Sequence, residues 1–319
     1  GLGYNNADMA KVYKINSSKG RVTYLSFLGR VNYSYDNRYI ATFTARRDGT
    51  SLFIKNKWGS FFSGAVAWNV DNEAFMKNQN TVNTLKLRLS AGQVGNSNVP
   101  TTGSYAQLFS NFYSFADVPA IGQSPASIAN EELTWETTTE GNFGVELGLF
   151  KDRFLINLDV YNKVTSDLLL EAPVINISGF EKAWQNIGKM RNRGIELSVN
   201  ALILKTKDWK WTANANFSHN KTRILELSSN GEPIYLPVAC VGSGNIIKLE
   251  EGGEIGNIYG YRTIGVYGLN EFEKDGRTPR PETAIETGNE RPGAMKFADL
   301  SGADGVPDGK ITADDRTVI

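Results

Sequence analysis

Apolar and polar side chains alternate with a period of two along residues 21–45, and this alternation restricts the segment to β structure. One set of alternate positions is aromatic or aliphatic and comprises Leu25, Phe27, Val31, Tyr33 and Tyr35. The other set is small, polar or charged and comprises Ser26, Arg30, Asn32 and Ser34. Successive side chains of a strand point to opposite faces, so the segment is predicted to be a two-faced strand. A polar turn at 36–38, followed by apolar Tyr39, Ala41, Phe43 and Ala45, predicts a hairpin.

Such a two-faced strand fits two different kinds of fold. In a transmembrane barrel the apolar face contacts lipid and the polar face lines a wet lumen. In a soluble sandwich the apolar face packs against a second sheet. The hairpin alone therefore leaves both folds open.

The same alternation recurs at 60–70, 84–93, 142–150, 154–164, 194–202 and 209–220. In these segments and the first hairpin, the polar face carries the charged residues Arg30, Arg46, Lys86, Arg88, Glu146, Asp159 and Glu196. Burying such charges in a dry sandwich core is costly, whereas facing a water-filled lumen costs little. We therefore predict that these side chains line the lumen of a barrel.

The connections between the predicted strands alternate in length. Short connections lie at 36–38, 71–81, 151–153 and 205–208, and longer ones lie at 49–59, 94–133, 164–190 and after 227. Outer-membrane barrels have short periplasmic turns and long external loops, whereas a sandwich has no reason for this alternation. The fold predicted is an all-β, antiparallel transmembrane barrel. Tryptophans near the predicted strand ends suit its interfacial girdles: Trp68, Trp135, Trp209 and Trp211.

Composition excludes several other classes of protein. The 319 residues carry 34 basic and 34 acidic side chains, which argues against a nucleic-acid binder with a basic surface. The single cysteine, Cys240, cannot form an internal disulfide, and the single histidine, His219, makes histidine-based metal sites or catalysis a poor hypothesis. No apolar run is long enough for a transmembrane helix, and the first residues do not form a signal peptide.

Several longer stretches resemble the C-terminal barrel region of the SusC/RagA family of TonB-dependent outer-membrane transporters. They include GRVNYSYDNRYIATFTARRDGTSLF, LKLRLSAGQVGN, NIGKMRNRGIELSVNALILKTKDWKWTANANFSHNKTRILEL and IYGYRTIGVY, in family order. The resemblance covers most of residues 21–319. It implies a 22-stranded barrel closed by an N-terminal plug, in the outer membrane of a Gram-negative, Bacteroidetes-like cell.

The resemblance also implies a function. A SusD-like surface lipoprotein would act as a lid, and TonB would drive the import of glycans or peptides. The chain offers about nine or ten strands, too few to close a barrel of that size. We therefore expect residues 1–319 to be part of a TonB-dependent receptor barrel domain, with the signal peptide, the plug and the final strands outside it.

Two groups of residues are candidates for further chemistry. The connection at 94–133 is rich in aromatics that could contact a ligand or the lid, or could instead pack the connection against its neighbours: Tyr105, Phe109, Phe112, Tyr113 and Phe115. The tail resembles the family's calcium-like loop and offers Asp299, Asp304, Asp308 and Asp314 as oxygen ligands, although an insertion stretches the spacing. Calcium is the only cofactor that the sequence suggests, and solvated turn acids are the alternative.

The sequence gives little support to an enzyme. Glu131, Glu132 and Glu136 lie too close in sequence to flank a glycosidic bond convincingly. The alternatives to a TonB-dependent importer are a passive porin-like channel and a soluble carbohydrate-binding β-sandwich.

Overall fold

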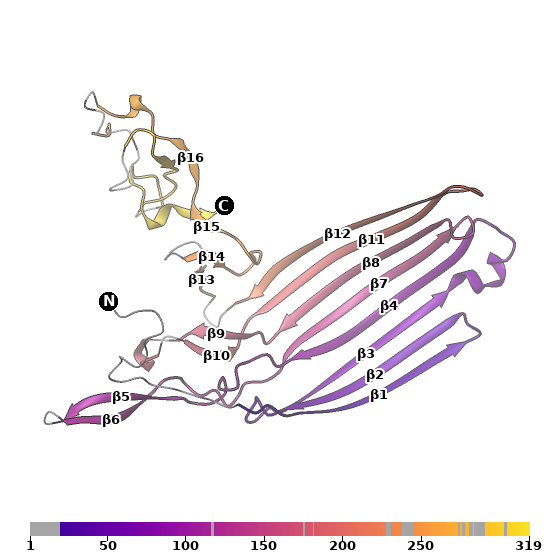
Figure 1. The fold of residues 1–319 in the computed structure, drawn as a ribbon, viewed down its shortest axis with the longest axis horizontal. Coiled ribbons are helices and arrows are strands. Elements are labelled where there is room, and N and C mark those ends of the chain that lie inside the picture. Colours follow the sequence, from indigo (N-terminus) through magenta and orange to yellow (C-terminus); the bar gives the residue numbers. More distant parts are fainter. Residues whose placement is uncertain are drawn as a thin grey trace, which may run out of the picture.

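The main body of the protein is one open antiparallel sheet of eight strands (Figure 1). Their order is β1-β2-β3-β4-β7-β8-β11-β12, so each strand of this sheet pairs with the next one along the chain, even across the long connections. The strands are β1 (Tyr24–Tyr35), β2 (Tyr39–Thr50), β3 (Trp58–Asn69), β4 (Val82–Asn96), β7 (Glu136–Leu149), β8 (Phe154–Ser166), β11 (Lys189–Lys205) and β12 (Lys210–Glu226). The computed structural model describes residues 20–115, 118–174, 176–180, 182–227, 231–237, 245–273, 275, 278–280, 283, 291–302 and 305–319.

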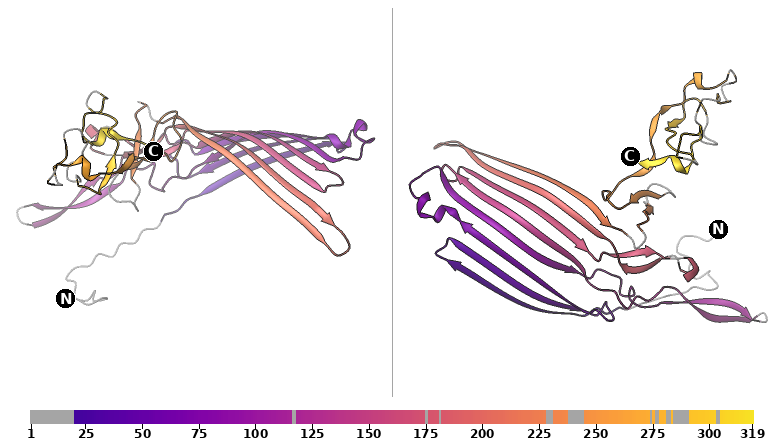
Figure 2. Two further views of the ribbon diagram at one scale, coloured as in Figure 1. Left: turned by 90° about the horizontal axis from the view of Figure 1, so that it is seen from above. Right: turned by 180° about the vertical axis from the view of Figure 1, so that it is seen from behind.

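The short turns lie at one end of the sheet and the long connections at the other (Figures 1 and 2). Asp36 and Asn37 turn β1 into β2 with φ values of 51° and 50°, a left-handed pair that Asp and Asn tolerate well. Between β3 and β4, the short helical turns η2 (Val70–Asn72) and η3 (Ala74–Met76) fill the connection. From β4 onward the connections alternate in length as predicted, with 97–135 and 167–188 long and 150–153 and 206–209 short. The prediction is wrong for the first pair, because the β2–β3 connection at 51–57 is shorter than the β3–β4 connection at 70–81.

The long connections contain strands that the sequence did not reveal. Between β4 and β7, β5 (Leu108–Phe115) pairs with β6 (Val118–Pro125) in a hairpin that projects away from the sheet (Figure 1). Between β8 and β11, β9 (Leu169–Pro173) pairs with β10 (Lys182–Asn186), and η4 (Asn176–Ser178) lies between them. The connections predicted at 94–133 and 164–190 therefore contain strand pairs of their own.

Short strand pairs follow the end of β12. They are β13 (Ile234–Pro237) with β14 (Asn245–Leu249), β15 (Tyr259–Tyr261) with β18 (Arg316–Val318), and β16 (Thr263–Val266) with β17 (Met295–Phe297). The turns η5 (Leu269–Glu271) and η6 (Ala313–Asp315) complete the region. Within the described part of the chain, no helix has the length and apolarity needed to cross a membrane.

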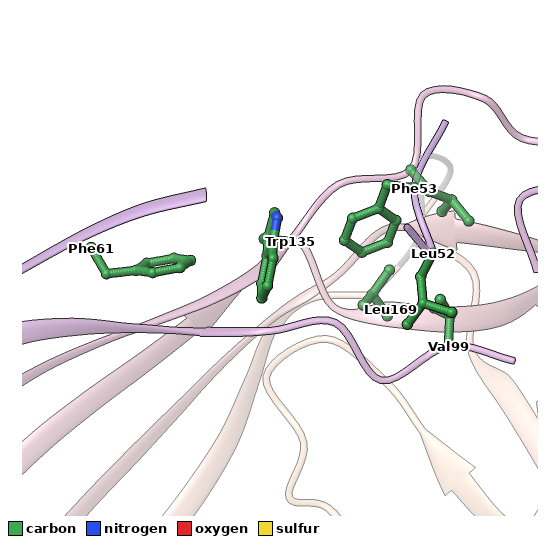
Figure 3. Close-up of a cluster of buried hydrophobic side chains, with 7 residues drawn as sticks. Leu52, Phe53, Phe61, Val99, Trp135 and Leu169 are labelled. Carbon is green, nitrogen blue, oxygen red and sulfur yellow. The ribbon is translucent and has the colours of Figure 1, made fainter. Parts of the chain in front are cut away.

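The buried apolar cluster lies at the bases of the long connections (Figure 3). It comprises Leu52, Phe53, Phe61, Val99, Leu133, Trp135 and Leu169. The Trp135 ring stands edge-on to Phe53 and Phe61, with centroids 5.9 and 5.7 Å away. Trp135 is therefore not part of an interfacial girdle, because it precedes β7 and packs inward onto the connections. Among the described residues, no other sheet packs on either face of the eight-stranded sheet (Figure 2).

Candidate functional site

The strand register gathers the alternating side chains into two continuous faces. One registered row across all eight strands is apolar except at its last position: Tyr33, Ala41, Val66, Leu89, Phe143, Val160, Ile195 and His219. The side chains of this face are well exposed, with Tyr33 at 61% and Leu89 at 58%. We call it the apolar face. Large apolar groups left uncovered over a whole sheet indicate a partner environment that is itself apolar.

The apolar band moves along the strands from one edge of the sheet to the other. In β1 it runs from Leu25 to Tyr35, and at β12 it runs from Trp209, the residue before that strand, to Phe217. The register connects Tyr35 with Phe217 across the sheet. The short-turn end of the band in β1 is therefore level with its long-connection end in β12.

This drift measures the tilt of the strands, which is the angle between the strand direction and the normal of the apolar layer. The centre of the band shifts by about nine residues, roughly 30 Å, across a sheet roughly 34 Å wide, given the usual rise per residue and strand spacing. The corresponding angle of about 40° falls within the tilt of transmembrane barrel strands. A slab of lipid crossed by tilted strands produces such a drift, whereas a sandwich core would follow the registered rows.

The opposite face, which we call the polar face, carries a network of ion pairs. The Arg88 guanidinium on β4 lies 3.2 Å from Oε1 of Glu146 on β7 and 3.1 Å from Oδ2 of Asp159 on β8. Lys86 Nζ lies 3.9 Å from the same Glu146 oxygen. These side chains are roughly one-third exposed, so water and salt screen the network.

Gly144 makes room for this network. Arg88 and Asp159 are two strands apart, and Gly144 on β7 is the registered residue between them. A Cβ atom at Gly144 would lie 2.8 Å from both Arg88 Nη2 and Asp159 Oδ1. The bridge can therefore cross β7 only where that strand has no side chain on this face.

The other charged residues predicted for this face lie apart from the network or at its margin. Arg30 donates to Thr44 Oγ1 at 3.2 Å, and Arg46 pairs with Asp48 at 2.6 Å. Glu196 lies opposite Asp159 in the register, and no ion pair involves it among the described residues. All seven residues share the polar face, and their role as lumen lining stays a prediction.

Sequence reasoning missed a second polar-face cluster on β7, β8 and β11. Lys163 pairs with Glu140 at 3.4 Å and lies 5.0 Å from the centre of the Tyr161 ring. That ring covers Gly194, where a Cβ atom would meet it at 2.4 Å. The alternation put Glu140, Tyr161 and Lys163 on this face, but only the register shows that they meet.

At the short-turn end, Glu73 joins two strands to the β3–β4 connection. Its carboxylate accepts hydrogen bonds from Tyr39 Oη at 2.8 Å and from Trp68 Nε1 at 3.0 Å. These bonds, with Tyr39 the larger influence, lower the pKa of Glu73. Trp68 thus sits at a strand end as predicted, and the strand-end residues Trp209 and Trp211 are exposed.

The predicted aromatic group lies on and beside the β5–β6 hairpin. Tyr105 and Phe109 are exposed, at 47% and 63%. The backbones of Phe112, Tyr113 and Phe115 belong to β5, and their side chains lie outside what the structure describes. The structure thus places the group on one projecting element rather than along an irregular loop.

The acidic tail forms hydrogen-bonded turns in its described part. Asp299 accepts backbone N–H groups of Asp308 and Gly309, at 3.3 and 2.7 Å. Asp304 lies outside the described residues, and no three potential ligand side chains converge in the part that is described. Asp314 is exposed and its amide donates to Thr312 Oγ1. Calcium binding by these four acids stays a prediction.

Asp315, which the sequence did not single out, is the buried carboxylate of the tail. It accepts backbone N–H groups of Leu300, Ser301 and Thr312 at 2.8, 3.0 and 2.7 Å. Burial acts to raise the pKa of Asp315, but these donors outweigh burial and lower it. The carboxylate therefore holds two segments of the tail together.

The three glutamates weighed as a glycosidase pair have other partners. Lys55 pairs with both Glu131 and Glu132. Glu136 accepts the backbone N–H of Leu169 at 3.2 Å and the Asn96 amide at 3.1 Å. These contacts tie together the bases of the long connections.

Comparison with known proteins identifies relatives over the whole chain. Residues 2–238 match the protein family described as TonB dependent receptor-like, beta-barrel. TonB-dependent receptor P3 of Formosa agariphila is 36% identical over 325 residues, covering 100% of this chain and 31% of that protein. TonB-dependent receptor SusC of Bacteroides thetaiotaomicron is 36% identical over 250 residues, covering 76% of this chain and 25% of that protein.

A solved structure shows the same arrangement of strands. The structure of the RagAB peptide transporter superposes with a TM-score of 0.75 at 28% identity, covering 93% of this chain and 30% of that chain. The chain thus spans between 25% and 31% of the length of these proteins.

Proposed function

The chain belongs to the TonB-dependent receptor β-barrel family, in its SusC/RagA branch, and from this membership we propose that it forms part of the wall of an outer-membrane importer of oligomeric nutrients. The observation that carries the proposal is the two-faced sheet, whose apolar band crosses the strands at about 40° while charges pair on the other face. The cargo is a glycan or a peptide, the latter as for the RagAB peptide transporter.

The polar face is the lumen side of this wall. Arg30, Arg46, Lys86, Arg88, Glu146, Asp159 and Glu196 line it, and the Arg88 network supports the proposal because its side chains stay partly hydrated. Paired charges present little net charge to a passing oligomer.

The β5–β6 hairpin contacts the lid or the cargo. It projects from the long-connection end of the sheet, where external loops lie in this kind of barrel (Figure 1). Exposed Tyr105 and Phe109, with Leu108 and Ile121 at 61% and 71% exposure, offer apolar surface to a SusD-like lipoprotein or to a sugar ring. TonB, acting through a plug domain, supplies the energy.

The tail is proposed to bind calcium through Asp299, Asp304, Asp308 and Asp314. The Asp308 backbone N–H donates to Asp299 Oδ1 at 3.3 Å, so these two residues are neighbours in the described part of the tail, and the proposal rests on the number of acids in this glycine-rich segment. Calcium titration of the full-length protein, with Asp308→Asn as the variant, tests this. Unchanged thermal stability of the wild type on adding calcium would refute it.

The transport proposal is tested with the native protein extracted from outer membranes in mild detergent. In the extract we expect heat-modifiable migration and a co-purifying lipoprotein. In intact cells we expect uptake of labelled oligosaccharide or oligopeptide that stops when TonB is removed. Uptake that continues without TonB would indicate a passive channel instead. A protein that fractionates without the membrane would overturn the proposal entirely.

A further inference from the structure

A cluster of cations lies on the membrane-facing side of the sheet. Arg191 and Arg193 on β11 are registered with Arg223 and Lys221 on β12. We call these four residues the cationic patch. The register is regular between Met190 and Leu202, so the patch shares the apolar face.

A shallow hollow on the apolar face confirms this placement. The hollow has a volume of about 1020 Å³, and both Arg193 and Lys221 line it together with Tyr33, Phe43 and Val66. Cations and lipid-facing apolar groups therefore border one continuous surface.

The patch begins where the apolar band ends. Toward the long connections, Ile195 is followed on this face by Arg193, and Phe217 and His219 are followed by Lys221. A charge on the lipid face of a barrel strand destabilises it at the bilayer midplane but costs little at the interface. The patch is thus level with the headgroups of the leaflet on the long-connection side.

Protein groups neutralise the patch only in part. Lys221 pairs with Glu254 at 2.9 Å, and both side chains are about half exposed. Arg193 Nε donates to the neutral Asn162 amide oxygen at 3.0 Å. Among the described residues, Arg191 Nε is buried without a hydrogen-bond partner. Arg223 is exposed, and after Lys221 it helps to lower the pKa of Glu254.

Positive charge therefore remains in excess on a surface that continues into lipid. Guanidinium groups present paired N–H donors that match the oxygens of a phosphate group. Cations at the short-turn end differ, because Arg38 pairs with Asp36 and Arg153 donates to the backbone of Leu202 and Ile203.

We propose that the cationic patch binds the phosphate groups of a phosphorylated glycolipid of the outer leaflet, whose acyl chains lie along the apolar face. The inference rests on the proposed membrane location, and it adds a lipid site that transport itself does not require. Arg191, Arg193, Lys221 and Arg223 supply the charge, and the apolar hollow below them receives the chains.

The test uses the full-length protein extracted in mild detergent and two probes, bis-phosphorylated lipid A and its dephosphorylated form. We expect the phosphorylated probe to raise the unfolding temperature and the dephosphorylated probe to leave it unchanged. The double variant R193Q/K221Q should bind the phosphorylated probe roughly tenfold more weakly, because two charge-assisted phosphate contacts are lost. Equal binding of both probes by the wild type would overturn the proposal.

The matched control is K151Q/K207Q, which removes two exposed cations at the short-turn end. It should bind the phosphorylated probe as the wild type does, and equal losses in both variants would refute a specific patch. If R193Q/K221Q does not fold, the comparison of the two probes on the wild type still tests whether the phosphate groups are recognised. If R193Q/K221Q loses lipid binding but is still extracted from the membrane and still supports uptake, the lipid site is separate from the proposed transport function.

Discussion

The two faces of the eight-stranded sheet differ in what their side chains depend on for a favourable environment. On the apolar face, side chains such as Tyr33 and Leu89 are left uncovered by the protein and rely on an apolar environment. On the polar face, Arg88 and its acidic neighbours are neutralised within the protein, strand against strand. Neighbouring residues of a strand lie on opposite faces, so a substitution and its neighbour in sequence can probe the two faces separately.

The largest effect is expected from placing a charge on the apolar face. Leu158 and Asn157 are adjacent on β8 but face opposite sides of the sheet. Leu158→Arg should lower the free energy of unfolding by about 2–4 kcal/mol, because the cation would lie near the bilayer midplane. Urea unfolding of the full-length protein in lipid vesicles measures this loss.

Asn157→Arg is the matched control for this substitution. Asn157 is registered with Glu146 on the polar face, so a new cation there gains an acidic neighbour. Its effect should stay within about 0.5 kcal/mol, as for most surface substitutions. Equal losses in the two variants would mean that the faces do not differ in environment.

A smaller effect is expected from closing the gap beneath the ion network. Gly144→Ala brings a Cβ atom to 2.8 Å from Arg88 Nη2 and Asp159 Oδ1, so that bridge must open. The expected loss is about 1 kcal/mol, the upper range for partly exposed ion pairs. Thermal or urea unfolding in vesicles is the measurement.

Gly141 provides the control on the same strand, because a Cβ atom there meets nothing within 4 Å. Gly141→Ala should be neutral or slightly stabilising, since alanine restricts the unfolded chain. A loss at Gly141 as large as that at Gly144 would show that the strand resists any side chain, whatever the network.

The faces could be predicted from the sequence, but the contacts across them could not. A period of two assigns each residue to a face, so the lipid side and the charged side followed directly from residues such as Leu87 and Arg88. Which charges meet depends on the register between strands, and the Arg88–Asp159 bridge spans 71 positions of sequence. Alternation within one strand contains no information about that register.

The connections were harder to predict for a related reason. The strands β5 and β6 have no two-residue alternation of apolar and polar residues, because a projecting hairpin has no buried face to impose one. Trp135 was assigned to an interfacial girdle, yet it packs on Phe53 and Phe61 from distant segments. Asp315 was overlooked because its importance comes from three backbone donors, not from its neighbours in sequence.

The smallest expected effect tests whether like charges on the polar face still repel. Glu196 lies directly opposite Asp159, and like charges at opposite positions of paired strands destabilise a sheet. Glu196→Gln should therefore stabilise the protein by about 0.3 kcal/mol at low salt, and the gain should fade as salt screens the pair. In the Asp159→Asn background the same substitution should give no gain, because the repelling partner is gone. If the stabilisation persists in that background, or does not change with salt, then it comes from hydrogen bonding of the new amide and not from relief of charge repulsion. A salt-dependent gain would show that Glu196 and Asp159 still repel each other although Asp159 is paired with Arg88. The charges of this face would then be hydrated and not fully neutralised.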